Sequence, residues 1–168
     1  LIFRNSWLHL ALGADLSNYS MTINDSFHGI ERNTVRFLHL SPYLKAEAHN
    51  HALSMDLSYL ERVSYPEYSY LLPAVNVKSQ YQYYSGSPDL KIPVSRQARL
   101  KLSYNSYSIG TVWNLSGSIS HIANPIVTDI RNILTDTCLE EYGLSLPAGS
   151  QLIRYTNGSS IPNYSIEA

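Results

Sequence analysis

Three residues that could ligate a metal ion stand at alternate positions of the sequence: Glu47, His49 and His51. Alternate residues of a β-strand project from the same face of a sheet, and zinc accepts carboxylate oxygens and imidazole nitrogens as ligands. The alternative interpretation is a polar loop that carries two surface histidines. The spacing therefore offers a candidate zinc site, but nothing else in the sequence requires a metal ion or another cofactor, and we predict none.

No combination of residues predicts catalysis. A glycine-rich phosphate loop, a G-x-S-x-G elbow, a Cys-x-x-Cys pair and an H-E-x-x-H motif are all absent from the sequence. The remaining candidate carboxylates are Asp129, Asp136, Glu140 and Glu141. They fit the solvated face of an amphipathic helix, and no nucleophile, base and orienting group assemble around them. We expect a non-enzymatic protein and keep a hydrolase of unrecognised type, acting through the candidate zinc site, as an alternative.

Polar residues without a single carboxylate alternate along three expected strands. The three rows are Asn76, Lys78, Gln80 and Gln82; Ser95, Gln97, Arg99, Lys101 and Ser103; and Asn114, Ser116 and Ser118. A solvated sheet face normally mixes both signs of charge, whereas cations among neutral donors and acceptors suit phosphates and bases. We therefore predict a nucleic-acid-binding face. The residues assigned to it are Asn76, Lys78, Gln80, Arg99, Lys101, Asn114 and Ser116.

The elements expected to position these residues are long antiparallel strands. Apolar and polar residues alternate over 53–59, 75–83, 99–104 and 107–120, and a period of two is typical of half-buried strands. Asn105-Ser106 supplies a turn between the last two strands. Residues 1–33 give no clear assignment, and the turn-rich residues 157–168 suggest an extended tail.

One helix is predicted near the C-terminal end of the sequence. Asn124 is a suitable N-cap, Pro125 suits the first helical position, and Gly143 follows the expected end. Apolar residues fall at three- and four-residue spacing between them. They are Ile126, Val127, Ile130, Ile133, Leu134, Cys138 and Tyr142. This spacing predicts an amphipathic helix over about 125–142.

The sequence thus predicts an α+β fold, mainly antiparallel β, in one domain of residues 1–168. A sheet of about five or six strands precedes the helix, which at about 10 Å thick is too narrow to cover it. Exposed apolar area of that size marks an interface, so we expect a second copy of the chain to cover it. The residues assigned to this interface are Ile126, Ile130, Ile133, Leu134 and Trp113.

Composition excludes several classes of protein. Hydrophobic residues make up 44% of the chain and charged residues 15%, and the formal net charge is −1. The single cysteine excludes an internal disulfide framework. No run of 18 apolar residues occurs, so we expect no transmembrane helix and no membrane partner.

The layout resembles the coat proteins of single-stranded RNA bacteriophages. The features that carry the resemblance are strands near 75–83, 94–104 and 107–120, the helix opening at Asn124-Pro125, and a proline-containing tail. The resemblance implies that two subunits interlock, with helices on the outer face of a joint sheet and RNA on its inner face.

These observations together predict a non-enzymatic, self-assembling coat protein that binds single-stranded RNA and is located in a virion or assembled particle. An alternative is an extracytoplasmic β-domain of a surface appendage or a carbohydrate-binding adhesin, at the cell surface or outside the cell. For that alternative, a group of tyrosines would contact sugar and the Asn-x-Ser sequons would accept glycans. These tyrosines are Tyr65, Tyr68, Tyr70, Tyr81, Tyr83, Tyr84, Tyr104 and Tyr107.

Overall fold

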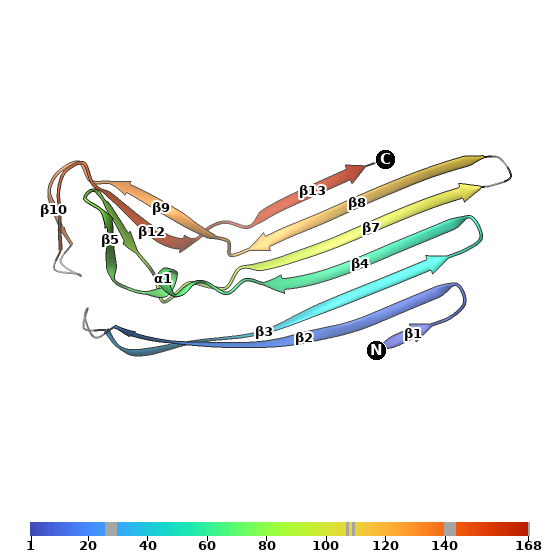
Figure 1. The fold of residues 1–168 in the computed structure, drawn as a ribbon, viewed down its shortest axis with the longest axis horizontal. Coiled ribbons are helices and arrows are strands. Elements are labelled where there is room, and N and C mark those ends of the chain that lie inside the picture. Colours follow the sequence, from blue (N-terminus) through green and yellow to red (C-terminus); the bar gives the residue numbers. More distant parts are fainter. Residues whose placement is uncertain (26–29, 107, 109, 140–143, 168) are drawn as a thin grey trace.

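The computed structural model describes residues 1–25, 30–106, 108, 110–139 and 144–167, and most of them lie in β-strands. A long, curved sheet makes up most of the structure, and a smaller sheet stands beside one of its ends (Figure 1). No helix in the described part of the chain is long and apolar enough to cross a membrane.

The large sheet is an antiparallel meander in which each strand pairs with the next strand along the sheet. Its strands are, in order, β1 (Ile2–Arg4), β2 (Leu8–Asp25), β3 (Ile30–His49), β4 (Leu53–Val63), β7 (Val94–Ser106), β8 (Thr111–Ala123) and β13 (Ile161–Glu167). Short connections join β1 to β2, β3 to β4 and β7 to β8 at one end of the sheet (Figure 1). Residues 157–168, expected as a tail, contribute β13, and residues 1–33 contribute β1, β2 and the start of β3.

Two long excursions leave the other end of the large sheet. Residues 64–93, between β4 and β7, hold α1 (Tyr68–Leu71), β5 (Val75–Ser79) and β6 (Gln82–Ser85). Residues 124–160, between β8 and β13, hold β9 (Ile126–Asn132), β10 (Thr137–Leu139), β11 (Leu144–Leu146) and β12 (Gln151–Asn157). The smaller sheet has the order β5-β6-β12-β9, with β6 and β12 parallel, and β10 pairs with β11.

Buried apolar clusters lie at the end of the molecule where the excursions are. Leu71, Leu72, Ala74 and Leu90 of the first excursion pack with Ile23 of β2. Tyr83 and Leu152 of the smaller sheet form a second cluster with Ile133, which follows β9, and Leu146 of β11. The β2–β3 hairpin reaches this end because its pairing continues to Asp25 and Ile30, whereas the pairing of β3 with β4 stops at Tyr43 and Leu60.

The predicted helix over about 125–142 is wrong. Residues 126–132 are β9, which pairs antiparallel with β12, and residues 137–139 are β10, while 140–143 lie outside the described residues. Asn124 does not cap a helix: it has a φ of 51° and turns the chain, and its carbonyl oxygen accepts a hydrogen bond from Asn157 Nδ2 at 3.0 Å. Ile, Val and Thr, which are stiff at χ1 and favour strands, fill this segment. The fold is therefore nearly all β and not α+β.

Candidate functional site on the polar face

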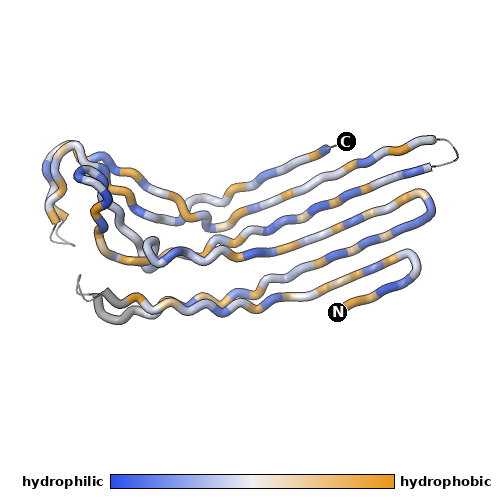
Figure 2. The backbone as a smooth tube through the Cα atoms, viewed as in Figure 1, coloured by the Kyte–Doolittle hydropathy of each residue, from blue (hydrophilic) through white to orange (hydrophobic). Residues whose placement is uncertain are grey.

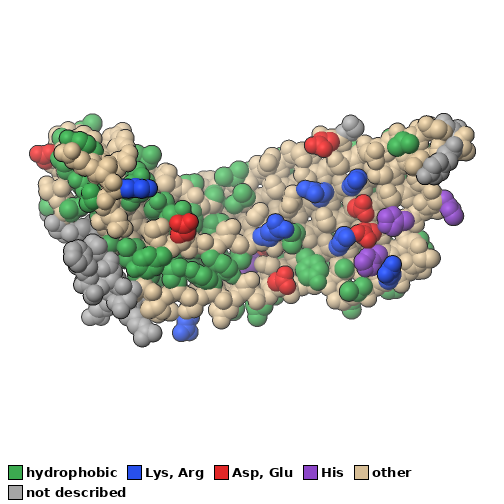
Figure 3. Space-filling view, viewed as in Figure 1, with side chains coloured by type: hydrophobic (Ala, Val, Ile, Leu, Met, Phe, Trp, Pro, Cys, Tyr) green, Lys and Arg blue, Asp and Glu red, His purple; other side chains and the backbone are tan. Residues whose placement is uncertain are grey.

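The two faces of the large sheet differ sharply in chemistry. In register across the sheet, Leu57, Leu100, Gly117 and Ile166 form one row, and Asp56, Lys101, Ser116 and Glu167 form the next. Because side chains alternate between faces, one face is apolar and the other polar, and hydropathy alternates visibly along the long strands of the large sheet (Figure 2). Charged and histidine side chains gather on the polar face over the large sheet (Figure 3).

Ion pairs on the polar face connect β2 and β3. His9 Nδ1 lies 3.2 Å from Glu47 Oε2, and the other oxygen of Glu47 forms an ion pair with Lys45. Both partners of Glu47 are partly exposed, so the contribution of these pairs to stability is small. Their effect on the surface is that the charges of this part of the polar face neutralise one another.

A basic pocket lies farther along the same face, over β7, β8 and β13. Its volume is about 360 Å³, and its polar lining consists of Arg99, Lys101, Ser116, Ser118, Ser165 and Glu167. Within the described part of the chain, Arg99 and Lys101 form no ion pair. Ser118 Oγ and Ser165 Oγ are hydrogen-bonded at 2.7 Å. This polar-face pocket presents a guanidinium beside hydroxyl groups, a combination that binds oxyanions.

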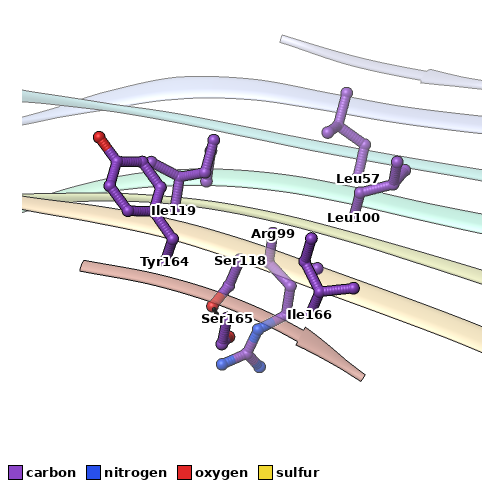
Figure 4. Close-up of a pocket in the computed structure, with 10 residues that line it drawn as sticks. Leu57, Arg99, Leu100, Ser118, Ile119, Tyr164, Ser165 and Ile166 are labelled. Atoms are coloured by element: carbon purple, nitrogen blue, oxygen red, sulfur yellow. Dashed lines mark hydrogen bonds between the residues drawn. The ribbon is translucent and has the colours of Figure 1, made fainter. Parts of the chain in front are cut away.

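The opposite face is apolar. It ends at a pair of aromatic rings toward the short connections and at a charged cluster toward the excursions. Figure 4 shows Ile119, Tyr164 and Leu100 on one side of the strands, while the side chain of Arg99 extends to the other side. At the end with the short connections, the rings of Tyr104 and Trp113 stack with centroids 5.7 Å apart.

A charged cluster marks the other boundary of the apolar face. The carboxylate of Glu61, whose side chain is only 7% exposed, accepts a hydrogen bond from Arg96 Nε at 2.8 Å. Its other oxygen lies 2.6 Å from His39 Nε2. The Tyr59 hydroxyl also donates to Glu61 Oε2, at 3.3 Å. Because the buried charge has these three partners, it does not incur the large cost of an unpaired ion.

The structure brings together four of the seven residues predicted to bind nucleic acid. Arg99 and Lys101 lie on the polar face of β7, and Asn114 and Ser116 lie on the same face of β8, where Lys101 is opposite Ser116 and Asn114 opposite Ser103. The other three belong to the smaller sheet or its turn: Asn76 and Lys78 are in β5, and Gln80 precedes β6. Lys78 Nζ lies 5.2 Å from the centre of the Tyr84 ring.

The predicted zinc ligands and interface residues are spread over different parts of the structure. Glu47 and His49 share the polar face of β3, and His51 lies in the following turn; no group of three or more metal-ligating side chains forms among the described residues. Ile126 and Ile130 are in β9, Ile133 is buried in the smaller sheet's core, Leu134 is exposed, and Trp113 stacks in the large sheet.

Sequence reasoning missed His9, Lys45, Glu61 and Arg96. The partners His9 and Glu47 are 38 residues apart, and Glu61 and Arg96 are 35 apart, so no local pattern links them. One signal was available. Leu8, Leu10, Leu12 and Leu16 stand at even positions around His9 and Asp15, which indicates a two-faced strand in the segment left unassigned.

A family model described as the outer membrane protein beta-barrel family matches residues 9–168 of the chain. Among curated proteins, no sequence matches the chain.

Solved structures of outer membrane receptors share the fold. The siderophore receptor PirA from Pseudomonas aeruginosa superimposes with a TM-score of 0.57 at 13% identity, over 95% of this chain and 30% of the receptor. The hemophore receptor HasR from Serratia marcescens, in complex with its hemophore HasA and heme, superimposes with a TM-score of 0.56 at 16% identity, over 95% of this chain and 28% of the receptor. The ferric enterobactin receptor PfeA from Pseudomonas aeruginosa superimposes with a TM-score of 0.54 at 12% identity, over 99% of this chain and 31% of the receptor. The chain thus spans about 30% of the length of these receptors.

These findings overturn the prediction of a self-assembling, RNA-binding coat protein in a virion, and with it the expectation of no membrane partner. The physical reason is that a regular two-faced sheet also suits a barrel wall, whose apolar face meets lipid and needs no second copy to cover it. The alternative of a cell-surface β-protein is nearer to the finding, and proteins of this kind are typically non-enzymatic. The family match covers nearly the whole chain, which therefore belongs to the outer membrane protein beta-barrel family.

Proposed function

We propose that the chain forms part of the wall of a non-enzymatic outer membrane barrel that takes up an anionic, iron-carrying small molecule. The observation that carries this proposal is the separation of faces in register, with Leu57, Leu100 and Ile166 on one and Asp56, Lys101 and Glu167 on the other. Transmembrane β-barrels alternate in this way between lipid and a polar interior. Three structural neighbours are receptors for a siderophore, for a hemophore with heme, and for ferric enterobactin.

The sheet edges support a larger, closed wall. Among the described residues, β1 and β13 each pair with one strand, and an open sheet edge in lipid would leave backbone N–H and C=O groups without partners. We therefore propose that further strands close the barrel beyond these edges. Transporters of this type have about 22 strands, of which the seven in the large sheet would be about a third.

The excursions define the orientation. Outer membrane barrels have short turns on the periplasmic side and longer loops outside the cell, so 64–93 and 124–160 would lie at the cell surface. They pack against the β2–β3 hairpin, where the rings of Tyr19 and Tyr65 stack with centroids 4.5 Å apart. This packing supports one domain over residues 1–168. Burial raises the pKa of the Tyr155 phenol in the smaller sheet.

Cysteine labelling on intact cells tests the orientation. Cys138 lies exposed in β10, so a maleimide carrying a polymer too large to cross the outer membrane should label it on intact cells. In a Cys138→Ser background, His51→Cys in the turn after β3 should be labelled only after the outer membrane is permeabilised. Labelling of position 51 on intact cells would mean that the orientation is reversed.

The ligand class is tested at the polar-face pocket. Arg99→Glu replaces the guanidinium by a carboxylate, so uptake of radioactive iron supplied as ferric enterobactin or as heme, both anionic, should fall about tenfold or more. The matched control is Arg36→Glu, because Arg36 is an exposed residue of β3 opposite Ser20 and outside this pocket. If deleting the gene leaves the uptake of both probes unchanged, the proposed ligand class is wrong.

A further inference from the structure

The apolar face is hollowed along Gly117. A cavity of about 350 Å³ is lined there by Leu57, Leu100, Gly117, Ile119, Tyr164 and Ile166 (Figure 4). A second hollow of about 160 Å³ shares Leu100, Gly117 and Ile166 with it and continues to Leu102 and Leu115. The two hollows form one groove that follows the strands, here called the Gly117 groove.

The protein does not fill this groove with its own atoms. A Cβ added at Gly117 would meet only the Ser165 carbonyl oxygen, at 3.8 Å. At Gly13 an added Cβ would overlap the Tyr43 ring, and at Gly86 it would come within 2.5 Å of the Leu72 carbonyl oxygen. Those two glycines make room for the rest of the chain. Gly117 leaves room outside the chain, and a glycine within a strand often marks the close approach of a ligand.

We propose that the Gly117 groove holds one acyl chain of a phosphate-bearing outer membrane lipid. The groove is continuous with the apolar face, which meets lipid in the proposed orientation; the inference rests on that part of the proposed function and not on the transported ligand. Tyr164 and Ile166, 68% and 82% exposed, are the apolar side chains of β13 that line the groove. A narrow, flexible chain fits between side chains of this kind, whereas the flat sheet of a second copy would leave the hollow empty.

The end of the groove toward the excursions offers a partner for the phosphate. Arg96 and His121 face each other across β7 and β8, one row beyond Ala98 and Ile119. The Nε–H of Arg96 donates to Glu61, which fixes the guanidinium while its side chain stays 48% exposed. A fixed guanidinium with further N–H groups available binds phosphate well.

Native mass spectrometry of the full-length protein tests the proposal. The protein is stripped of lipid in detergent and then offered phosphatidylglycerol. We expect one phosphatidylglycerol to bind, and Gly117→Leu, which fills the groove, to reduce occupancy at least fivefold. The matched control is Ala46→Leu, which places the same leucine side chain on the apolar face of β3 outside the groove, adding three carbon atoms where Gly117→Leu adds four. Equal occupancy in Gly117→Leu and the wild type would overturn the proposal.

Further variants separate the two parts of the site. Arg96→Gln should remove the preference for phosphatidylglycerol over neutral diacylglycerol, while the Gly117 groove still binds the acyl chain of either lipid. If Gly117→Leu does not assemble, Tyr164→Ala removes one lining side chain instead and should lower occupancy. If filling the groove changes the oligomeric state and leaves lipid binding intact, a second copy is the occupant and the proposal fails. Iron uptake, measured separately, reports on the proposed transport function alone.

Discussion

Leu100→Arg is expected to lower the free energy of unfolding of the membrane-inserted protein by about 2 to 4 kcal/mol, the cost of placing an arginine near the bilayer midplane on the lipid face of a barrel. Leu100 stands between Leu57 and Gly117, in the middle of the apolar face. The measurement is urea unfolding of the protein in lipid vesicles, together with the folded fraction in outer membranes, read from its gel mobility with and without heating.

The matched control for this variant is Ser103→Arg on the same strand. Ser103 belongs to the polar face and lies opposite Ser54 and Asn114, so in the proposed barrel an arginine there would face the polar interior. Its expected effect on the unfolding free energy is within about 0.5 kcal/mol, as for substitutions in solvated positions. Equal losses for the two variants would contradict the assignment of the faces.

Gly86→Ala is expected to destabilise the first excursion by about 3 kcal/mol, because overpacking against fixed backbone costs about that much. The added Cβ would lie 2.5 Å from the Leu72 carbonyl oxygen and 2.6 Å from that of Tyr70. Both carbonyls already accept hydrogen bonds, from Gly86 N–H at 3.1 Å and Ser87 N–H at 2.7 Å. Three kilocalories correspond to roughly a 100-fold larger open population, so trypsin should cleave this excursion, at Lys78 or Lys91, about that much faster.

A glycine with free space around it is the control for this effect. Gly117→Ala adds the same methyl group where the nearest protein atom is 3.8 Å away. Trypsin cleavage in the excursion should then match the wild type. Unchanged cleavage in Gly86→Ala would show that the backbone near Leu72 yields more easily than its hydrogen bonds indicate.

The strands of the large sheet could be predicted because their signal is local. Alternation over 53–59 and 99–104 lies within β4 and β7, and that over 107–120 includes most of β8. Pattern also placed Arg99, Lys101, Asn114 and Ser116 on a common face, as the register shows. Alternation does not reveal which medium the apolar face meets, so the same pattern fitted a shell subunit and a barrel wall.

The elements that sequence reasoning missed depend on distant partners. The spacing of Ile126, Ile130 and Ile133 suits a helix, and what makes the segment a strand is its pairing with β12, where Ile130 faces Ile153. The cluster at Glu61 draws on β3, β4 and β7. Such contacts arise only after the meander has formed.

The pairing of β3 with β4 ends partway along β3. This point separates a region of the large sheet that is held by backbone hydrogen bonds from one that is held by side-chain contacts. Below the last pair, Tyr43 and Leu60, backbone hydrogen bonds join every neighbouring strand from β1 to β13. Pro42, which has no N–H to donate, immediately precedes Tyr43 in the sequence. In the part of β3 that comes before Pro42, the His39–Glu61 contact links β3 to β4. The outer half of the β2–β3 hairpin is therefore held to β4 and to the first excursion by side-chain contacts. Separating this part of the hairpin from β4 would break side-chain contacts and leave the backbone ladder from Tyr43 and Leu60 onward intact.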